Sequence, residues 1–171
     1  SEVSIAGNNT MLYANFNYQG TEFASSIDVS AMTHLHIDVW TNNSSDLNAF
    51  LISPGPVETP YSINVPTSGW ASIDIPLSAF SPVDLADVFQ MKFDGNGDIY
   101  LDNIYFYDDG GSGGGGGNDT PTVGAPTPTE NAADVISIFS DSYTNIAGTN
   151  LNPFWGQSTV QSEVSIAGNN T

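Results

Sequence analysis

The chain has 171 residues and a formal net charge of −18, because Lys92 is the one Lys or Arg among 19 Asp and Glu residues. A field of this sign repels phosphate backbones and anionic lipids, so we expect no nucleic-acid partner. No apolar run is long enough to cross a bilayer, and membrane insertion is not expected either. The chain also lacks Cys, which excludes disulfides and thiolate metal sites.

Short β-rich runs separated by turn residues fill most of the chain. Residues 33–41 alternate Leu35, Ile37 and Val39 with polar or aromatic side chains, a period of two that predicts a strand. Similar runs occupy residues 11–18, 22–29, 48–53, 61–65, 70–75, 89–93, 98–107 and 134–144. Helical turns are expected only at residues 76–80 and 81–88. The pattern predicts an all-β, antiparallel, jelly-roll-like β-sandwich of about eight to ten strands with little helix.

The decapeptide SEVSIAGNNT occurs twice, at residues 1–10 and 162–171. Residues 110–130 are rich first in Gly and then in Pro and Thr, as expected of a linker between domains. We therefore expect residues 1–109 to be the C-terminal part of one β-sandwich repeat. Residues 131–171 are then the N-terminal part of the next repeat, or of the same repeat in a circular permutant. Both arrangements remain open, and one copy of the decapeptide is left over to pair with a neighbouring unit.

Placed in the order 125–159, 2–23 and 93–107, the segments resemble the carbohydrate-binding-module-like β-sandwich repeats of secreted and cell-surface bacterial proteins that use type IX secretion. The resemblance implies an extracellular or cell-surface location. It also implies a non-catalytic repeat of a long adhesin, stalk or filament, with glycan-binding capacity. Its partners would be neighbouring copies of the repeat, through strand sharing, and polysaccharide. The alternative function is a carbohydrate-binding module attached to a secreted polysaccharide-degrading enzyme.

The resemblance further implies a structural calcium ion where the first and last strands meet. The matching hard oxygen ligands are Asp102, Asn103 and Asp141. The acidic turn at residues 94–98 lacks the later ligands of a calcium loop, and we interpret it as a hairpin turn.

No pattern of catalytic residues is present. The two histidines are not accompanied by the motif that a nucleophilic serine would need to form a catalytic triad with them. No pair of carboxylates has the environment that glycoside hydrolysis needs. We therefore expect that the protein is not an enzyme. The spacing of His34 and His36 could suit two zinc ligands, but no third ligand is indicated.

Sugar binding requires an aromatic platform with polar neighbours. The strand phase opposite the core in residues 33–41 and 70–75 predicts a carbohydrate-binding face. Its residues are Trp40, Trp70, His34, His36, Asp38 and Asp74. The alternative for each of these tryptophans, and for Trp155, is packing in the core or under a loop.

Overall fold

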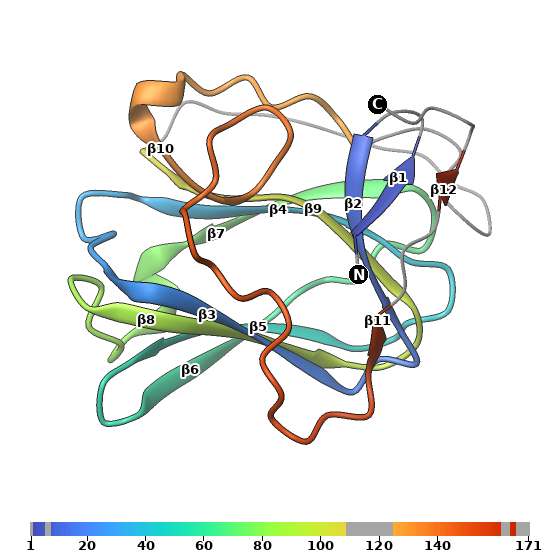
Figure 1. Cartoon of the computed structure of the whole chain (residues 1–171), viewed down its shortest axis with the longest axis horizontal. Coiled ribbons are helices and arrows are strands. Elements are labelled where there is room, and N and C mark those ends of the chain that lie inside the picture. Colours follow the sequence, from blue (N-terminus) through green and yellow to red (C-terminus); the bar gives the residue numbers. More distant parts are fainter. Residues whose placement is uncertain (1, 6–7, 109–124, 162–164, 167–171) are drawn as a thin grey trace.

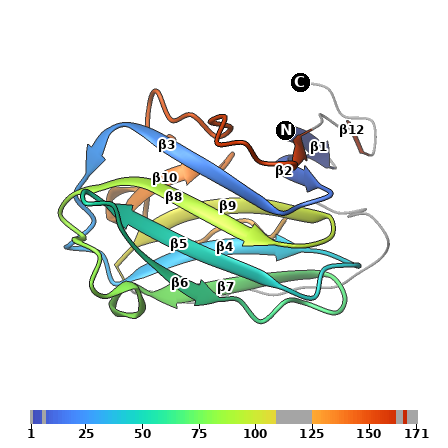
Figure 2. The same ribbon diagram turned by 90° about the horizontal axis from the view of Figure 1, so that it is seen from below.

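The structure is a computed structural model that describes residues 2–5, 8–108, 125–161 and 165–166. Two β-sheets pack face to face in two layers (Figures 1 and 2). The predicted all-β, antiparallel sandwich with little helix is confirmed. The described part of the chain holds no helix long and apolar enough to span a membrane.

We call the larger sheet sheet A and the smaller one sheet B. Among the described residues, sheet A has eight strands and sheet B has four, somewhat more than predicted. Sheet A consists of β1 (Glu2–Ile5), β2 (Asn8–Ala14), β4 (His34–Trp40), β7 (Trp70–Pro76), β9 (Ile99–Tyr107), β10 (Val135–Phe139), β11 (Val160–Gln161) and β12 (Ser165–Ile166). Sheet B consists of β3 (Tyr18–Ile27), β5 (Leu47–Ser53), β6 (Val57–Ser62) and β8 (Val88–Gly95). Two short 3₁₀ turns are η1 (Leu77–Phe80) and η2 (Ala132–Asp134).

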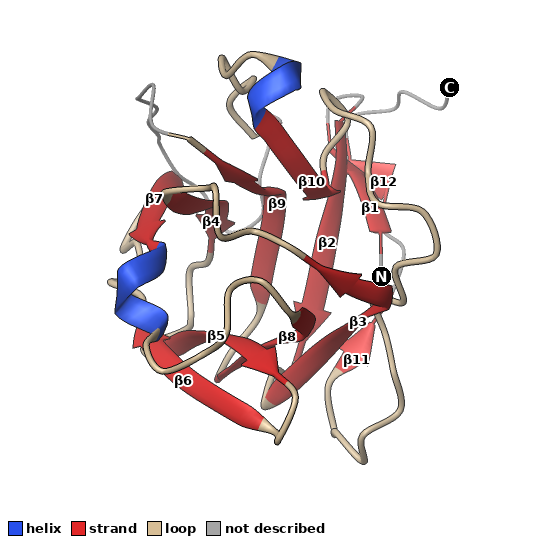
Figure 3. Cartoon of the chain, turned by 90° about the vertical axis from the view of Figure 1, so that its left-hand side faces the viewer, coloured by secondary structure: helices blue, strands red, loops and turns tan. Residues whose placement is uncertain are grey.

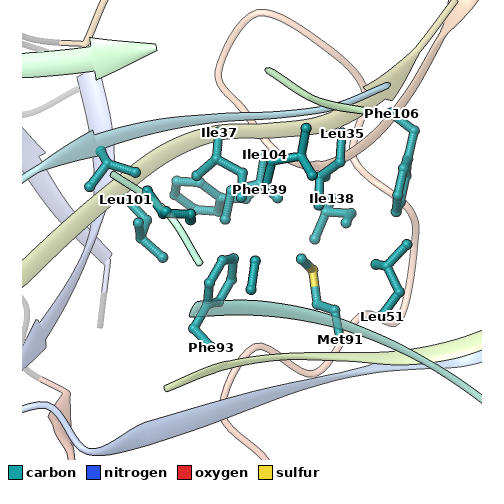
Figure 4. Close-up of a cluster of buried hydrophobic side chains, with 14 of the residues drawn as sticks. Leu35, Ile37, Leu51, Met91, Phe93, Leu101, Ile104, Phe106, Ile138 and Phe139 are labelled. Atoms are coloured by element: carbon teal, nitrogen blue, oxygen red, sulfur yellow. The ribbon is translucent and has the colours of Figure 1, made fainter. Parts of the chain in front are cut away.

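The core lies between the two sheets, and the alternation of the strands explains it. Leu35, Ile37 and Val39 of β4 all point inward and are fully buried, as their period of two predicts. They face Leu51, Met91 and Phe93 across the interior, as Figure 4 shows for part of the cluster.

Strand β9 changes partner halfway along one of its edges. Residues Ile99–Leu101 pair with β2, whereas Ile104–Tyr107 pair with β10. Its other edge pairs with β4 over nearly its whole length. At the change of partner Asn103 has φ 45°, in the left-handed region that Asn tolerates better than most residues.

Residues 131–161 pack against strands from the first part of the same chain (Figure 3). Besides β10 on β9 and β11 on β2, the backbones of Asn150 and Glu22 exchange hydrogen bonds of 2.7 and 2.9 Å. Residues 131–161 and the strands of residues 8–107 therefore contribute to one sandwich in this chain. Whether they belong to a tandem array or to a permutant stays a prediction.

Candidate functional site

The outward face of sheet A carries the residues predicted to bind carbohydrate. Pairing of β4 with β7 places His36 beside Asp74, Asp38 beside Ser72, and Trp40 beside Trp70. The side chains therefore share one face, as the alternation predicts. The face is covered, however: Trp40 and Trp70 are only 2% and 4% exposed.

Both tryptophans pack in a small second hydrophobic cluster with Leu12 and Tyr100, against which Ala14 and Ala125 also pack. Trp40 meets Tyr100 edge to face, with 5.2 Å between ring centroids. This packing corresponds to the alternative of a buried tryptophan. Since a stacking platform needs an open ring face, we place no binding role on these two residues, and their predicted role in sugar binding remains untested.

His36 lies between two carboxylates on the same face. Its Nδ1 is 2.7 Å from Asp74 Oδ1 and its Nε2 is 3.4 Å from Asp38 Oδ1. Burial acts to lower the pKa of His36, but the hydrogen bonds and charges of Asp38 and Asp74 outweigh it and raise the pKa to about 9. The imidazole is therefore a buried cation at neutral pH, and its hydrogen bond lowers the pKa of Asp74.

Residues 126–130 lie over this ion cluster. Asn103 Nδ2 donates to the carbonyl of Pro126 at 2.8 Å, and Tyr105 Oη donates to Glu130 Oε2 at 3.1 Å. Residues 126–130 and Tyr105, together with His36, Asp38 and Ser72, line a small cavity of about 20 Å³. That volume holds about a single water and no sugar ring. His34 lies at the end of the face, stacked on Tyr107 with 5.4 Å between centroids.

The residues predicted to bind calcium gather where β9 changes partner. Asp102 is completely buried, and its carboxylate accepts hydrogen bonds from Thr10 Oγ1 at 3.1 Å and from the backbone N–H of Asn103 at 2.7 Å. Desolvation, reinforced by the charges of Asp38 and Asp141, raises the pKa of Asp102 to about 8. Asp141 is exposed, and its carboxylate accepts two hydrogen bonds from Asn9, at 2.6 and 3.1 Å.

Most of the oxygen atoms predicted to bind calcium already accept hydrogen bonds from other groups of the protein. The carbonyl oxygen of the Asn103 side chain accepts from Ser140, and its amide donates to Asp38. Within the described ranges no group of three or more His, Asp and Glu side chains is arranged to hold a metal ion. The arrangement fits a hydrogen-bonded structural role better than a calcium cage, and calcium binding at these residues remains a prediction.

The outward face of sheet B carries a different set of side chains, which cross-strand pairing arranges in three rows. One row holds Glu22, Gln90, Ile52 and Glu58; the next Gly20, Lys92, Phe50 and Pro60; the third Tyr18, Asp94, Asn48 and Ser62. Each row crosses all four strands. Apolar and hydrogen-bonding side chains thus lie side by side on this face, where Phe50 and Ile52 are buried.

Trp155 lies on this face at the position of Gly20. A Cβ on Gly20 would come within 2.3 Å of the indole, so only glycine allows the ring to lie against β3. The indole Nε1 donates to Glu22 Oε1 at 3.0 Å, and Gln90 Nε2 donates to the same oxygen at 3.1 Å. The half-buried ring is therefore held by a specific contact at each end.

Two hollows share Lys92 in their lining, and Trp155 lines the first of them. The first, of about 290 Å³, is lined by Trp155, Gln90, Lys92, Ile52, Pro56 and Glu58. The second, of about 500 Å³, is lined by Lys92 with Asn17, Tyr18, Asp46, Asp94 and Gly95. We call the two hollows together the sheet B groove. Lys92 Nζ lies 3.9 Å above the Phe50 ring and 2.9 Å from Glu58 Oε2, which fixes the ammonium group at the middle of the groove.

Most of the sheet B groove was not predicted from the sequence. Trp155 was expected in the core or under a loop, and Gln90, Glu22 and Glu58 were not singled out. The available signal was weak: an aromatic pair, Phe154 and Trp155, in a segment rich in Asn, Pro and Gly. Phe154 proves to be 91% exposed, the one large hydrophobic side chain so exposed among the described residues.

The structure thus defines the class of the protein as an all-β antiparallel sandwich with one covered face and one grooved face. No family model matches the sequence, and no curated protein matches it. Among solved structures, the chain is similar to the family 11 carbohydrate-binding module of the cellulosomal cellulase Lic26A-Cel5E of Clostridium thermocellum. The identity is 21%, the match covers 61% of this chain and 77% of that chain, and the TM-score is 0.46.

Proposed function

We propose that this chain is a non-catalytic, glycan-binding β-sandwich whose binding surface is the sheet B groove. The observation that carries the proposal is Trp155, an indole held against Gly20 at the border of a hollow of about 290 Å³ whose lining is partly apolar and partly polar. The C–H faces of a sugar ring stack on an aromatic ring, while amides and carboxylates bond its hydroxyls. Gln90 and Glu58 supply such groups on two different strands of the groove.

The charge of the groove favours a neutral polysaccharide. Its one cation, Lys92, is already paired with Glu58, whereas Asp46 and Asp94 line the adjoining hollow. A uronic-acid or sulfated chain would meet uncompensated negative charge there, in a protein of net charge −18. The hydroxyls of a neutral chain donate hydrogen bonds to carboxylates without a charge penalty.

The fixed hydrogen bonds of the groove support binding over catalysis. Glu22 accepts from Trp155 and Gln90, and Glu58 is bonded to Lys92. Each carboxylate thus orients a neighbouring side chain. Pairs of this kind give a rigid recognition surface, because the side chains lose little further freedom when a ligand binds.

We infer that the wider role is that of an extracellular or cell-surface repeat, in an adhesin, stalk or filament. The duplicated decapeptide and the Gly-rich then Pro/Thr-rich segment support this role. The alternative, a binding module attached to a secreted polysaccharide-degrading enzyme, uses the same groove. The sequences that flank the repeat in its gene would distinguish the two.

Native gel electrophoresis in soluble polysaccharide tests the proposal. Hydroxyethyl cellulose and galactomannan serve as neutral probes, and alginate serves as the acidic one. We expect retardation by at least one neutral probe, none by alginate, and loss of retardation in Trp155→Ala. Phe154→Ala is the matched control, because the neighbouring ring is exposed and does not line the groove.

Two results would contradict the assignment. Undiminished retardation of Trp155→Ala would exclude the sheet B groove. Loss of retardation in the conservative variants Trp40→Phe or Trp70→Phe, with the fold intact by circular dichroism, would instead favour the face of sheet A that the sequence predicted.

A further inference from the structure

The edge of β2 is covered by two strands that lie far apart in the sequence. Toward the end of β2, Val160 and Gln161 of β11 pair with Ala14 and Tyr13. Toward its start, β1 pairs antiparallel with β2, from Glu2 opposite Met11 to Ile5 opposite Asn8. Both strands run in the same direction along one edge, as Figure 1 shows at the right of the molecule.

The register of these two strands is continuous. Each step forward along an antiparallel strand moves one residue back along its partner. If β11 were extended in its own register, Glu163 would stand opposite Met11, and Ile166 would stand opposite Asn8. Those are the positions that Glu2 and Ile5 occupy.

The sequences at these positions are identical as well. Residues 163–166 and residues 2–5 both read EVSI. In the structure Ser165 and Ile166 of the second copy lie one strand further out and pair parallel with Ser4 and Ile5 of β1. Because the two sequences are identical, every backbone pair that the first copy makes with β2 is also open to the second copy. A one-residue difference in register would have turned each side chain to the opposite face, and no such difference exists.

We propose that the edge of β2 from Asn8 to Met11 is a docking surface for the second copy, Glu163–Ile166, which takes the place of β1. When the second copy fills the edge, β11 and residues 162–166 form one uninterrupted strand, and Glu2–Ile5 is released. The released strand is then able to pair with the edge of β2 in a second molecule of this chain, provided that neither of that molecule's own EVSI copies occupies the edge. This inference deepens the repeat role proposed above and is independent of the sheet B groove.

Matched proline variants of the full chain test the proposal. Val3→Pro disables the first copy, Val164→Pro disables the second, and the double variant disables both, because proline lacks the N–H and resists strand pairing. We expect each single variant to melt close to the wild type and the double variant to melt clearly lower. A fall in the melting temperature of Val3→Pro as large as that of the double variant would overturn the proposal.

Binding of a labelled peptide, STVQSEVSIAG, gives a second measurement. Fluorescence anisotropy should show binding to the double variant and little binding to the wild type or to either single variant. If Val3→Pro binds the peptide as well as the double variant does, the second copy does not fill the edge, and the proposal fails. Should the double variant not fold, Ser4→Pro and Ser165→Pro provide the equivalent pair one residue along.

Mixing the double variant with the wild type tests strand donation between molecules. A complex that is seen by sedimentation velocity and is dissolved by the peptide supports it, and the absence of any complex contradicts it. Polysaccharide retardation is measured in parallel on the same variants. Because that readout depends on Trp155 and not on β2, failure of the strand proposal and failure of the glycan proposal are distinguishable.

Discussion

Single residues on the covered face of sheet A determine how the protein responds to pH. His36 is a buried cation that two carboxylates stabilise, and its ring stacks on Tyr105 with 4.7 Å between centroids. In the unfolded chain these partners are lost, and the imidazole regains its ordinary pKa of 6.5. The difference between the two states couples folding to proton binding.

We predict that the free energy of unfolding decreases as the pH rises from 6.5 toward about 9, the raised pKa of His36. Below pH 6.5 both states bind the proton and the stabilisation is complete, whereas through this window the native state holds a proton that the unfolded state has released. Urea unfolding at half-unit steps of pH measures the slope. His36→Gln should be less stable at pH 6 and should show a shallower decline, because Asp102, whose pKa is raised to about 8, still contributes a decline of the same sign below that pH. An equal slope in the variant and the wild type would assign the dependence to groups other than His36.

At the scale of elements, one side chain lies where β9 changes partner and bonds to several elements at once. Asn103 donates to Asp38 Oδ2 and to the carbonyl of Pro126, both at 2.8 Å, and accepts from Ser140 Oγ at 2.8 Å. It thereby links β9 to β4, to the segment that covers sheet A, and to the end of β10. Its positive φ bends β9 at this point.

Replacing Asn103 should therefore loosen several elements together. We predict that Asn103→Ala lowers the free energy of unfolding by about 1–3 kcal/mol, because buried groups of Asp38 and Ser140 lose a partner. Asn103→Gly loses the same hydrogen bonds but accepts the positive φ, so it should be less destabilised than the alanine variant. Urea unfolding compares the two. Equal stability of Asn103→Ala and wild type would show that the hydrogen bonds contribute little.

The elements also show what local sequence can and cannot predict. Strict alternation in β4 identified Leu35, Ile37 and Val39 as core, because the period of two is a local property. Whether Trp40 is open or covered depends instead on Leu12 and Ala125, which come from distant parts of the chain. In the same way, Trp155 reaches the groove only through its contact with Gly20, 135 positions earlier, which no local pattern signals.

At the scale of the whole molecule, the charge of −18 is the dominant electrostatic feature. Like charges on a compact chain repel one another more than on an expanded one, and salt screens that repulsion. We predict that the melting temperature rises when NaCl is increased from about 0.01 to about 0.5 M, as differential scanning fluorimetry would measure. An unchanged melting temperature would mean that the repulsion is already relieved in the native state.

A comparison of calcium and magnesium salts at the same ionic strength distinguishes binding at a specific calcium site from general screening of the negative charge. If the predicted ion binds at Asp102, Asn103 and Asp141, CaCl₂ should raise the melting temperature more than MgCl₂ does, and the excess should vanish on chelation and in Asp141→Asn. Equal effects of the two salts would leave the hydrogen-bonded arrangement as the complete account of these residues.

The position of Lys92 has a consequence for proteolysis. A trypsin-like protease, which requires Lys or Arg, has a single peptide bond to cut in 171 residues, and that bond lies inside β8, a central strand of sheet B. Cleavage needs an extended, accessible backbone, and the backbone of β8 is paired on both edges, with β3 and with β5. The native chain therefore offers such enzymes no cut site among its loops, and nicking after Lys92 reports only molecules in which sheet B has opened.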